Sequence, residues 1–386
     1  MLRFEFHNPT RIIFGKGRLA EAGAWIEGLS RKVLLVIGRG SIKRHGIFDI
    51  VMDSIKAHEI RVEVLEGVQS NPILSKVEEG IEIVRREGLD LVAALGGGSV
   101  MDTAKAIAAG ALLKGGSVWD FFSGKQQITQ ALPVVTIPTL AASGSEMNGY
   151  MVITNEKTGH KLAAGSPHLY PAVSILDPET TFSVPKDYTA YGGVDAICHL
   201  LEPYFNGPYP YTPVQDRLAE GLIKTIMETT QGAIESPRDY DSRASMMWAA
   251  TLALCGLTKA GVGDHFFPVH VIEHAVSALF GVPHGAGLAA LLPGWMKWRA
   301  GKEAGKIAQF GARVFELGKT VNAPSAINAF TGWLRRIGCP ASLSELGISK
   351  KDHQRIADNA SRQVTVWNMD PPYSRENILK ILSLSQ

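Results

Sequence analysis

The spacing of hydrophobic residues changes near residue 180. Before that point, short apolar runs rich in β-branched residues alternate with segments in which apolar residues recur every three or four positions. The short runs predict buried strands, and the longer period predicts amphipathic helices. The expected strands are 33–37, 61–65, 89–95 and 133–138, and the expected helices are 47–58, 71–87 and 100–112. This alternation indicates an α/β domain with a mostly parallel, Rossmann-like sheet covered on both faces.

Beyond residue 180 the spacing is mainly helical and strand signals are scarce. We expect helices at 245–259, 269–280, 302–317, 324–337 and 352–358. At 386 residues the chain is too long for one simple core. We therefore predict two domains, a dinucleotide-binding α/β domain of residues 1–180 and an all-α, metal-binding and catalytic domain of residues 181–386.

Composition narrows the class of protein. A net charge of +2 gives no reason to expect nucleic acid or an acidic membrane as a partner. No signal peptide and no apolar run of about 18 residues is present, so no membrane span is expected. The three cysteines form no C-x-x-C pair, which favours a cytoplasmic protein. Cys198 adjoins His199, but we interpret it as a small buried thiol rather than a ligand.

Two glycine- and hydroxyl-rich loops follow expected strands. The first is G-G-G-S at residues 96–99, between a strand and a helix, where free backbone N–H groups favour a phosphate. It lacks the G-x-G-x-x-G spacing, so by itself it predicts only an anion-binding turn. The second is P-T-L-A-A-S-G-S-E at residues 138–146. Two such loops at strand ends fit a nucleotide lying across the carboxyl edge of the sheet. Asp102 either pairs with the helix dipole or faces that ligand.

One carboxylate and three imidazoles form a candidate metal site. Asp195 and His199 are four residues apart and so share one helical face. His270 lies on an expected helix, and His284, between Pro283 and Gly285, is interpreted as part of a loop that folds back onto that helix. Four such donors hold a divalent transition metal and leave a position open, which is typical of a catalytic site.

These motifs together resemble the iron-containing (group III) alcohol dehydrogenases, nearest to the butanol dehydrogenase-like branch. The resemblance rests on F-G-K-G at 14–17, V-Q-S-N-P at 68–72, G-G-G-S-V-M-D-T-A-K at 96–105, A-S-G-S-E at 142–146 and the histidine segment 270–284. Residues 366–372 depart from the glycine-containing stretch of the family. The resemblance implies a dehydroquinate synthase-like architecture and a homodimer.

The resemblance also implies individual roles. Asp195, His199, His270 and His284 match the family's metal ligands. His274 matches a non-ligand histidine beside the nicotinamide and substrate, and with Asp102 it forms the candidate catalytic pair. The residues that match cofactor contacts are Asn71, Gly97, Gly98, Ser99, Asp102, Thr139, Ser143 and Lys161.

The residues after the first expected strand indicate which nicotinamide cofactor is preferred. NAD-selective enzymes place an acidic side chain there to bind the ribose 2′-hydroxyl. This chain instead has Gly38, followed by Arg39-Gly40-Ser41, so a 2′-phosphate meets space, a hydroxyl and nearby positive charge from Arg39 or Lys43. We therefore predict NADP(H), with NAD as the alternative. The ligand types suit Fe²⁺ first, by resemblance, and Zn²⁺ second.

The predicted reaction is reversible hydride transfer between a primary alcohol or aldehyde and NADPH. His274 is the expected proton relay, because imidazole titrates near neutrality. Two related enzymes remain as alternatives, a dehydroquinate synthase-like lyase and a glycerol dehydrogenase-like polyol oxidoreductase. The lyase needs clustered Lys and Arg, whereas the histidine segment has apolar neighbours such as Phe266, Phe267 and Phe280. A non-catalytic nucleotide sensor is the third alternative.

Overall fold

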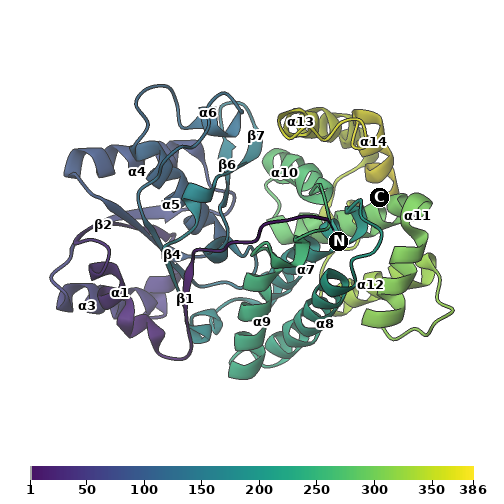
Figure 1. The fold of residues 1–386 in the computed structure, drawn as a ribbon, viewed down its shortest axis with the longest axis horizontal. Helices are drawn as coiled ribbons and strands as arrows, with labels where there is room; N and C mark the ends of the chain where they lie inside the picture. Colours follow the sequence, from purple (N-terminus) through teal and green to yellow (C-terminus); the bar gives the residue numbers. More distant parts are fainter. Residues whose placement is uncertain (1) are drawn as a thin grey trace. The chain divides into compact units, whose positions relative to one another are not determined.

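The computed structural model describes residues 2–386, which form two compact units. The sheet unit contains residues 7–184 and 237–251, and the helical unit contains the segment ending at Phe6 together with 185–236 and 252–386. Figure 1 labels most of their helices and several of their strands. The chain passes from the first unit to the second at Val184–Pro185, close to the predicted division at residue 180. Residues 237–251, expected in the second domain, group with the sheet.

Six parallel strands form the sheet, in the order β1-β8-β5-β4-β2-β3. Their bounds are Arg11–Phe14 (β1), Lys32–Gly38 (β2), Arg61–Val68 (β3), Leu91–Gly96 (β4), Val134–Pro138 (β5) and Val173–Leu176 (β8). The predicted α/β architecture is confirmed. The sequence pattern did not predict β1 and β8, which have only four residues each.

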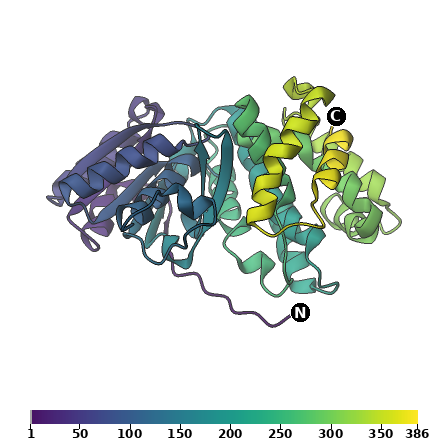
Figure 2. The same ribbon diagram turned by 90° about the horizontal axis from the view of Figure 1, so that it is seen from above.

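Helices cover both faces of the sheet, which explains its continuous apolar runs. Leu34 and Val36 of β2 point to the face covered by α4 (Leu74–Glu87) and α5 (Gly98–Ala111). The alternate residues Val33, Leu35 and Ile37 point to the face covered by α1 (Ala22–Glu27) and α3 (Ile47–Ala57). Figure 2 shows helices lying over the sheet.

The loops of the sheet unit differ from the sequence prediction in two places. The helix expected from Asn71 begins at Leu74, because Asn71 has a left-handed φ of 56° and the Pro72 carbonyl accepts a hydrogen bond from Thr154 N–H at 2.7 Å. An antiparallel hairpin of β6 (Tyr150–Asn155) and β7 (His160–Gly165) was not predicted.

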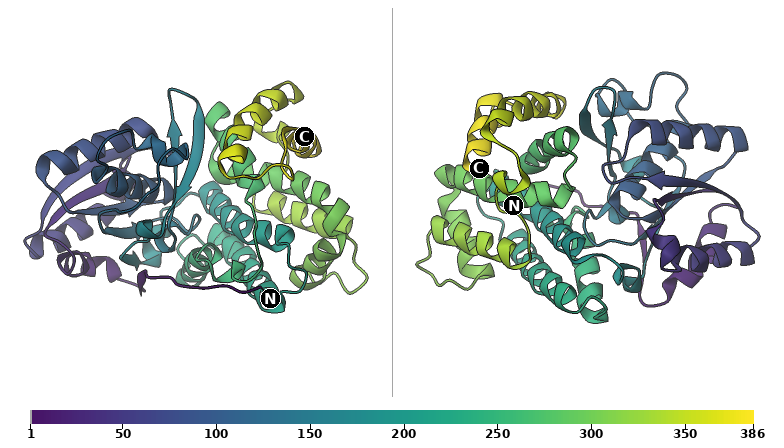
Figure 3. Two further views of the ribbon diagram at one scale, coloured as in Figure 1. Left: turned by 45° about the horizontal axis from the view of Figure 1, so that its top comes forward. Right: turned by 180° about the vertical axis from the view of Figure 1, so that it is seen from behind.

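The helical unit contains seven long helices among the described residues. They are α7 (Lys186–Asn206), α8 (Pro213–Glu235), α10 (Pro268–Phe280), α11 (His284–Val314), α12 (Ala323–Arg336), α13 (His353–Val366) and α14 (Arg375–Leu384). Helix α7 packs against α8 and α11, and α10 packs against α13. Figure 3 shows the C-terminal helices α13 and α14 side by side, in yellow. In the part of the chain described, no helix has the length and apolar character that crossing a membrane requires.

The expected helices of this half exist, but several of their predicted bounds were wrong, including the end of α13 at Val366 instead of 358. The helix expected over 245–259 is α9 (Tyr240–Ala253), which ends before Gly256, where φ is 98°. The helix expected over 302–317 is the second part of α11, which bends at Glu303. Helix α11 begins at His284, so this histidine lies in a first helical turn and not in the expected loop.

A glycine allows α11 to begin directly against α7. A Cβ atom at Gly285 would lie 2.3 Å from the Tyr191 carbonyl oxygen, and backbone gives way less easily than a side-chain tip. Gly301, in the same helix, has open space around it. The contact at Gly285 therefore fixes where the first turn of α11, including His284, meets α7.

We expect Gly285→Ala to lower the free energy of unfolding by about 1–3 kcal/mol, because the added methyl group overpacks this contact. The matched variant Gly301→Ala should be neutral or more stable by up to about 1 kcal/mol, since alanine is the better helix former. Urea unfolding of both variants measures the difference. Equal stability of the two variants would contradict the close-packing argument.

Candidate active site

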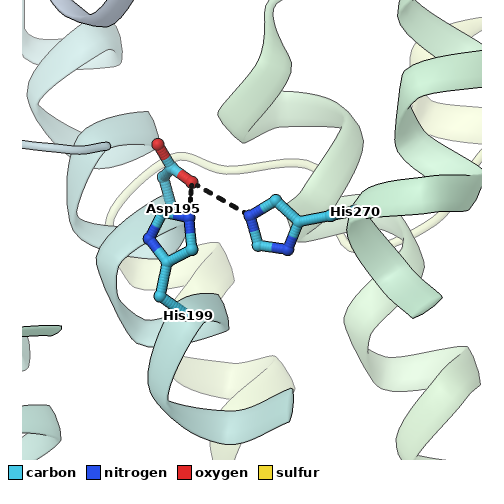
Figure 4. Close-up of side chains that lie close together, drawn as sticks. All are labelled: Asp195, His199 and His270. Atoms are coloured by element: carbon cyan, nitrogen blue, oxygen red, sulfur yellow. Dashed lines mark hydrogen bonds and ion pairs between the residues drawn. The ribbon is translucent and has the colours of Figure 1, made fainter. Parts of the chain in front are cut away.

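Three helices of the helical unit bring Asp195, His199, His270 and His284 together. Asp195 and His199 lie on α7, His270 on α10 and His284 at the start of α11. The Nε2 atoms of the three histidines lie 3.5, 3.4 and 3.7 Å, in that order, from the same oxygen, Asp195 Oδ1. Figure 4 shows Asp195, His199 and His270 turned toward one another. The structure thus places all four predicted ligands in one cluster.

The ligand atoms of Asp195, His199 and His270 lie within 4.8 Å of one another, as the ligands of one metal ion would, and His284 Nε2 approaches the same Asp195 oxygen. Ligand atoms about 2.1 Å from a tetrahedral metal are about 3.4 Å apart, close to the three observed distances. Asp195, His199 and His270 are buried, and His284 is half-buried. The donor set of three imidazole nitrogens and one carboxylate oxygen suits Fe²⁺, Zn²⁺ or a similar divalent ion.

The electrostatics of the cluster favour a cation at its centre. Although burial opposes it, the three histidines hold the pKa of Asp195 below its usual range, so this carboxylate stays ionised. Burial lowers the pKa of His199 to about 3, which leaves a neutral imidazole with a lone pair to donate. Burial also opposes charge on His270, but the carboxylates of Glu202 and Asp195 raise its pKa to about 10. The site therefore stabilises positive charge between two carboxylates.

Sequence reasoning missed two glutamates at this cluster. The other ring nitrogen, Nδ1, of His270 meets Glu202, and that of His284 meets Glu273. Both glutamates are fully buried. A signal for them exists in the sequence, because each is the sole carboxylate within an apolar helical stretch, H-L-L-E at 199–202 and H-V-I-E-H at 270–274.

His274 lies in the same unit, beside the four predicted ligands. Its ring centre is 5.7 Å from that of His284, and its Nδ1 atom is 2.9 Å from Gln363 Oε1. Because an amide oxygen only accepts, Nδ1 of His274 carries a proton, and Nε2 has a lone pair whenever the ring is neutral. Cys198, next to His199 on α7, is buried, and burial raises the pKa of its thiol well above the usual value.

The predicted nucleotide residues lie at the carboxyl edge of the sheet unit. Strand β2 lies between β3 and β4, so the chain changes direction across the sheet between β2 and β4, where α/β sheets bind nucleotides. Gly38 ends β2, and the turn after β4 leads directly into α5 at Gly98. No side chain caps this helix start, so its first N–H groups are available to an anion.

The two predicted loops contact each other. A Cβ atom at Gly98 would lie 2.6 Å from Ser143 Oγ, and Thr139 N–H donates to the Gly96 carbonyl at 3.1 Å. Ser99 lies in the first turn of α5. The close approach explains a glycine at position 98, because a side chain there would press on Ser143 of the second loop.

Asp102 and Lys105 hold the second loop from α5. Asp102 accepts hydrogen bonds from Ser145 Oγ at 2.7 Å and from Val152 N–H at 2.9 Å. The fully buried Lys105 ammonium donates to the carbonyl oxygens of Ser145, Asn148 and Tyr150 at 2.6, 2.8 and 3.0 Å. Burial lowers the pKa of Lys105 to about 8. Sequence reasoning identified Asp102 but missed Lys105.

The remaining predicted cofactor residues form two groups at this edge. Lys161 of β7 donates to Asn71 Oδ1 at 2.9 Å, so these two belong together. Gly38, Gly40 and Ser41 lie where β2 leads into the short helix α2 (Ser41–Arg44). Exposed cations surround this turn, including Arg39, which bonds Gln69, and Lys43, which pairs with Glu66 at 2.5 Å.

Comparison with known proteins places the chain in a family. A profile described as "Iron-containing alcohol dehydrogenase" matches residues 9–178, and one described as "Fe-containing alcohol dehydrogenase family, C-terminal" matches residues 189–385. The chain is 40% identical to the probable NADH-dependent butanol dehydrogenase 1 of Bacillus subtilis over 100% of both chains. It is 37% identical to the NADPH-dependent aldehyde reductase YqhD of Escherichia coli over 90% of both.

A solved structure gives the same result. The NADH-dependent butanol dehydrogenase A of Thermotoga maritima superimposes with a TM-score of 0.94 at 44% identity, covering 100% of this chain and 99% of the other. The chain therefore belongs to the iron-containing alcohol dehydrogenase family, in its butanol dehydrogenase-like branch, and is an NAD(P)-dependent alcohol dehydrogenase.

Proposed function

We propose that the chain catalyses reversible hydride transfer between NADPH and an aldehyde or primary alcohol, at a divalent metal ion held by Asp195, His199, His270 and His284. The convergence of three imidazole Nε2 atoms on Asp195 Oδ1 carries the proposal. Such a set binds a transition metal, and the family of the chain supplies the reaction class. Hydride transfer also requires a nicotinamide, which the carboxyl edge of the sheet unit is suited to bind.

We propose Fe²⁺ as the metal, with Zn²⁺ as the alternative. Fe²⁺ accepts more than four ligands, and Zn²⁺ can expand to five, so either leaves a position for a substrate oxygen. When bound, the metal supplies Lewis-acid polarisation of that oxygen, and the nicotinamide supplies or accepts the hydride. Two apolar residues flank His270: Val271 on α10 and Phe267 just before that helix. They favour an aliphatic or aromatic aldehyde.

The protein's own groups bind, orient and move a proton. We assign the pyrophosphate to the first N–H groups of α5, with Ser99, Thr139 and Ser143. Both carboxylate oxygens of Asp102 accept hydrogen bonds, so we assign it the task of fixing the loop beside the nicotinamide. The lone pair on His274 Nε2, opposite its bond to Gln363, is suited to take or return the alcohol proton.

We propose NADP(H) as the preferred cofactor because no acidic side chain stands at the end of β2. Gly38 leaves space for a 2′-phosphate, and Ser41 offers a hydroxyl group. Arg39, Lys43 and Arg44 add exposed positive charge at the same turn. The preference depends on this turn alone, and the named relatives include both NADH- and NADPH-dependent enzymes.

The first test is a steady-state assay with butanal and NADPH, before and after removal of metal with a chelator. We expect activity that disappears on chelation and returns with Fe²⁺ added anaerobically or with Zn²⁺. His270→Ala should lose metal and activity together, because one ligand is gone. Elemental analysis accompanies each assay, and the oxidation of glycerol by NADP⁺, compared with that of butanol, tests the polyol alternative. Full activity in metal-free protein would contradict the proposal.

The cofactor preference is tested by Gly38→Asp. A Cβ atom at Gly38 would meet only ordinary contacts, 3.6 Å from the Val68 carbonyl and 3.9 Å from Val100 Cγ2, so the variant should fold. The new carboxylate repels a 2′-phosphate and binds a 2′-hydroxyl. We expect the ratio of kcat/KM for NADPH to that for NADH to fall at least about tenfold.

Gly28→Asp is the matched control for Gly38→Asp. It adds the same charge before β2 begins, at the opposite edge of the sheet, where a Cβ atom has neighbours at 3.7 Å. Its cofactor ratio should equal that of the unaltered protein. A wild-type preference for NADH would overturn the NADP(H) proposal.

The proton relay is tested by His274→Ala. Because the ring supplies proton transfer and not a metal bond, kcat should fall by about 10²–10⁴-fold with metal content retained. His353→Ala is the control, since it removes another buried histidine that is bonded to a glutamine, at the start of α13. It should keep most of the activity. Loss of metal from the His274 variant would show that this residue is a ligand instead.

A further inference from the structure

We propose that Glu202 and Glu273 are positioning residues that set the affinity of the metal site. Each would hold one histidine ligand with Nδ1 protonated and Nε2 directed at Asp195 Oδ1. The inference rests on the proposed metal site and adds to it a set of groups that would never touch the metal. Four features of the two glutamates support this role: their burial, their saturated hydrogen bonds, the glycine beside Glu273 and the contrast with His199.

Glu202 is saturated by donors that leave one orientation for His270. It is fully buried on α7, one turn beyond His199. Its Oε1 atom accepts the backbone N–H of Val269 at 2.5 Å, and Oε2 meets His270 Nδ1. The Cys198 thiol lies 3.4 Å from the same Oε2. A carboxylate only accepts, so His270 Nδ1 must carry a proton and Nε2 is left for a metal.

Glu273, on α10, bonds His284 Nδ1 as Glu202 bonds His270 Nδ1. It is fully buried on α10, where Oε1 accepts the hydroxyl of Ser277 and Oε2 meets His284 Nδ1. Gly287, one turn after His284, makes room for it, because a Cβ atom there would lie 2.8 Å from both Glu273 Cγ and Oε1. The carboxylate is thus confined by α11, the helix that carries the ligand it orients.

Burying two carboxylates against the Nδ1 atoms of two imidazoles costs free energy unless positive charge lies nearby. An ionised carboxylate pays a large desolvation penalty in an apolar interior. Hydrogen bonds from His270 and His284 recover part of it, and a divalent ion on the far side of each ring would recover more. The arrangement is therefore suited to a metal-bound state, in which each carboxylate makes its imidazole a stronger donor.

His199, in the same site, has no glutamate on its Nδ1 atom. Its Nδ1 atom is buried and has no hydrogen-bond partner among the described residues. Its orientation comes instead from α7 and from its ring stacked on His270 at 4.5 Å between centres. Two of the three imidazoles are therefore held by glutamates and one by packing, so the glutamates affect only the ligands of α10 and α11.

Glutamine substitution separates this role from a purely structural one. Gln keeps the size of Glu and an oxygen that accepts the Nδ1 proton, but it removes the charge. We expect Glu202→Gln and Glu273→Gln each to weaken binding of Co²⁺ to the metal-free protein by about 10–100-fold. Competition with a coloured chelator measures the affinity, and the visible absorption of bound Co²⁺ reports the ligand geometry.

Gly287→Ala tests Glu273 without changing its charge. The added methyl group displaces the carboxylate, so Co²⁺ affinity should again fall, whereas Gly301→Ala in the same helix should leave it unchanged. Glu220→Gln is the control for loss of a buried carboxylate, because Glu220 bonds Tyr204 and Arg313 and none of the histidines. It should bind Co²⁺ as the unaltered protein does.

Two outcomes would overturn the inference in different ways. If the unaltered protein binds Co²⁺ and both glutamine variants bind it within about threefold, Glu202 and Glu273 do not set affinity, and the proposed function stands. If the unaltered protein binds no divalent metal, the proposed function fails as well. Thermal unfolding of the metal-free variants, with NADPH affinity as a second readout, distinguishes weaker metal binding from loss of fold.

Discussion

In the helical unit, three histidines from three helices approach one oxygen atom, Asp195 Oδ1. Three histidine Nε2 atoms from α7, α10 and α11 lie within 3.7 Å of Asp195 Oδ1, and the helices that carry them pack closely to bring this about. The approach of α11 to α7 requires a glycine at position 285, because the Tyr191 carbonyl occupies the space of a side chain. In the proposed metal site, donor type and charge would decide which metal binds, and helix packing would decide where it lies. Residues that would not touch the metal therefore still affect the proposed site.

In the sheet unit, a buried ammonium group holds the two glycine- and hydroxyl-rich loops in place. Its two loops follow parallel strands, and a cation buried beneath them ties one loop to the other's helix. Lys105 is held inside by three backbone carbonyls and compensated by the nearby carboxylates of Asp102 and Glu146. A buried ammonium without these acceptors would be very costly. Lys105 thus links the middle of α5 to the second loop and the residues after it through three hydrogen bonds.

Much of the site was predictable from sequence, because helical and strand periods place side chains without further knowledge. Residues four apart share a helical face, so the proximity of Asp195 and His199 was predicted from their spacing. Strands β2, β4 and β5 were predicted from the apolar runs that burial on both faces demands, and the edge strand β3 was predicted from its β-branched residues. What failed were features that depend on tertiary contacts. Strands β1 and β8 are too short to show a pattern, and Asn71 takes a left-handed turn that its sequence does not require.

The prediction for His284 shows the same limit at the site itself. A proline before it and a glycine after it read as a loop, because both residues are common in loops. In the structure Pro283 only precedes the helix start, and Gly285 serves close packing, so the same two residues begin a helix of 31 residues. The chemistry of His284 was predictable because it depends on residue type. Its rigid placement, and the glutamate that orients it, depend on which helix packs against it, and no local pattern contains that information.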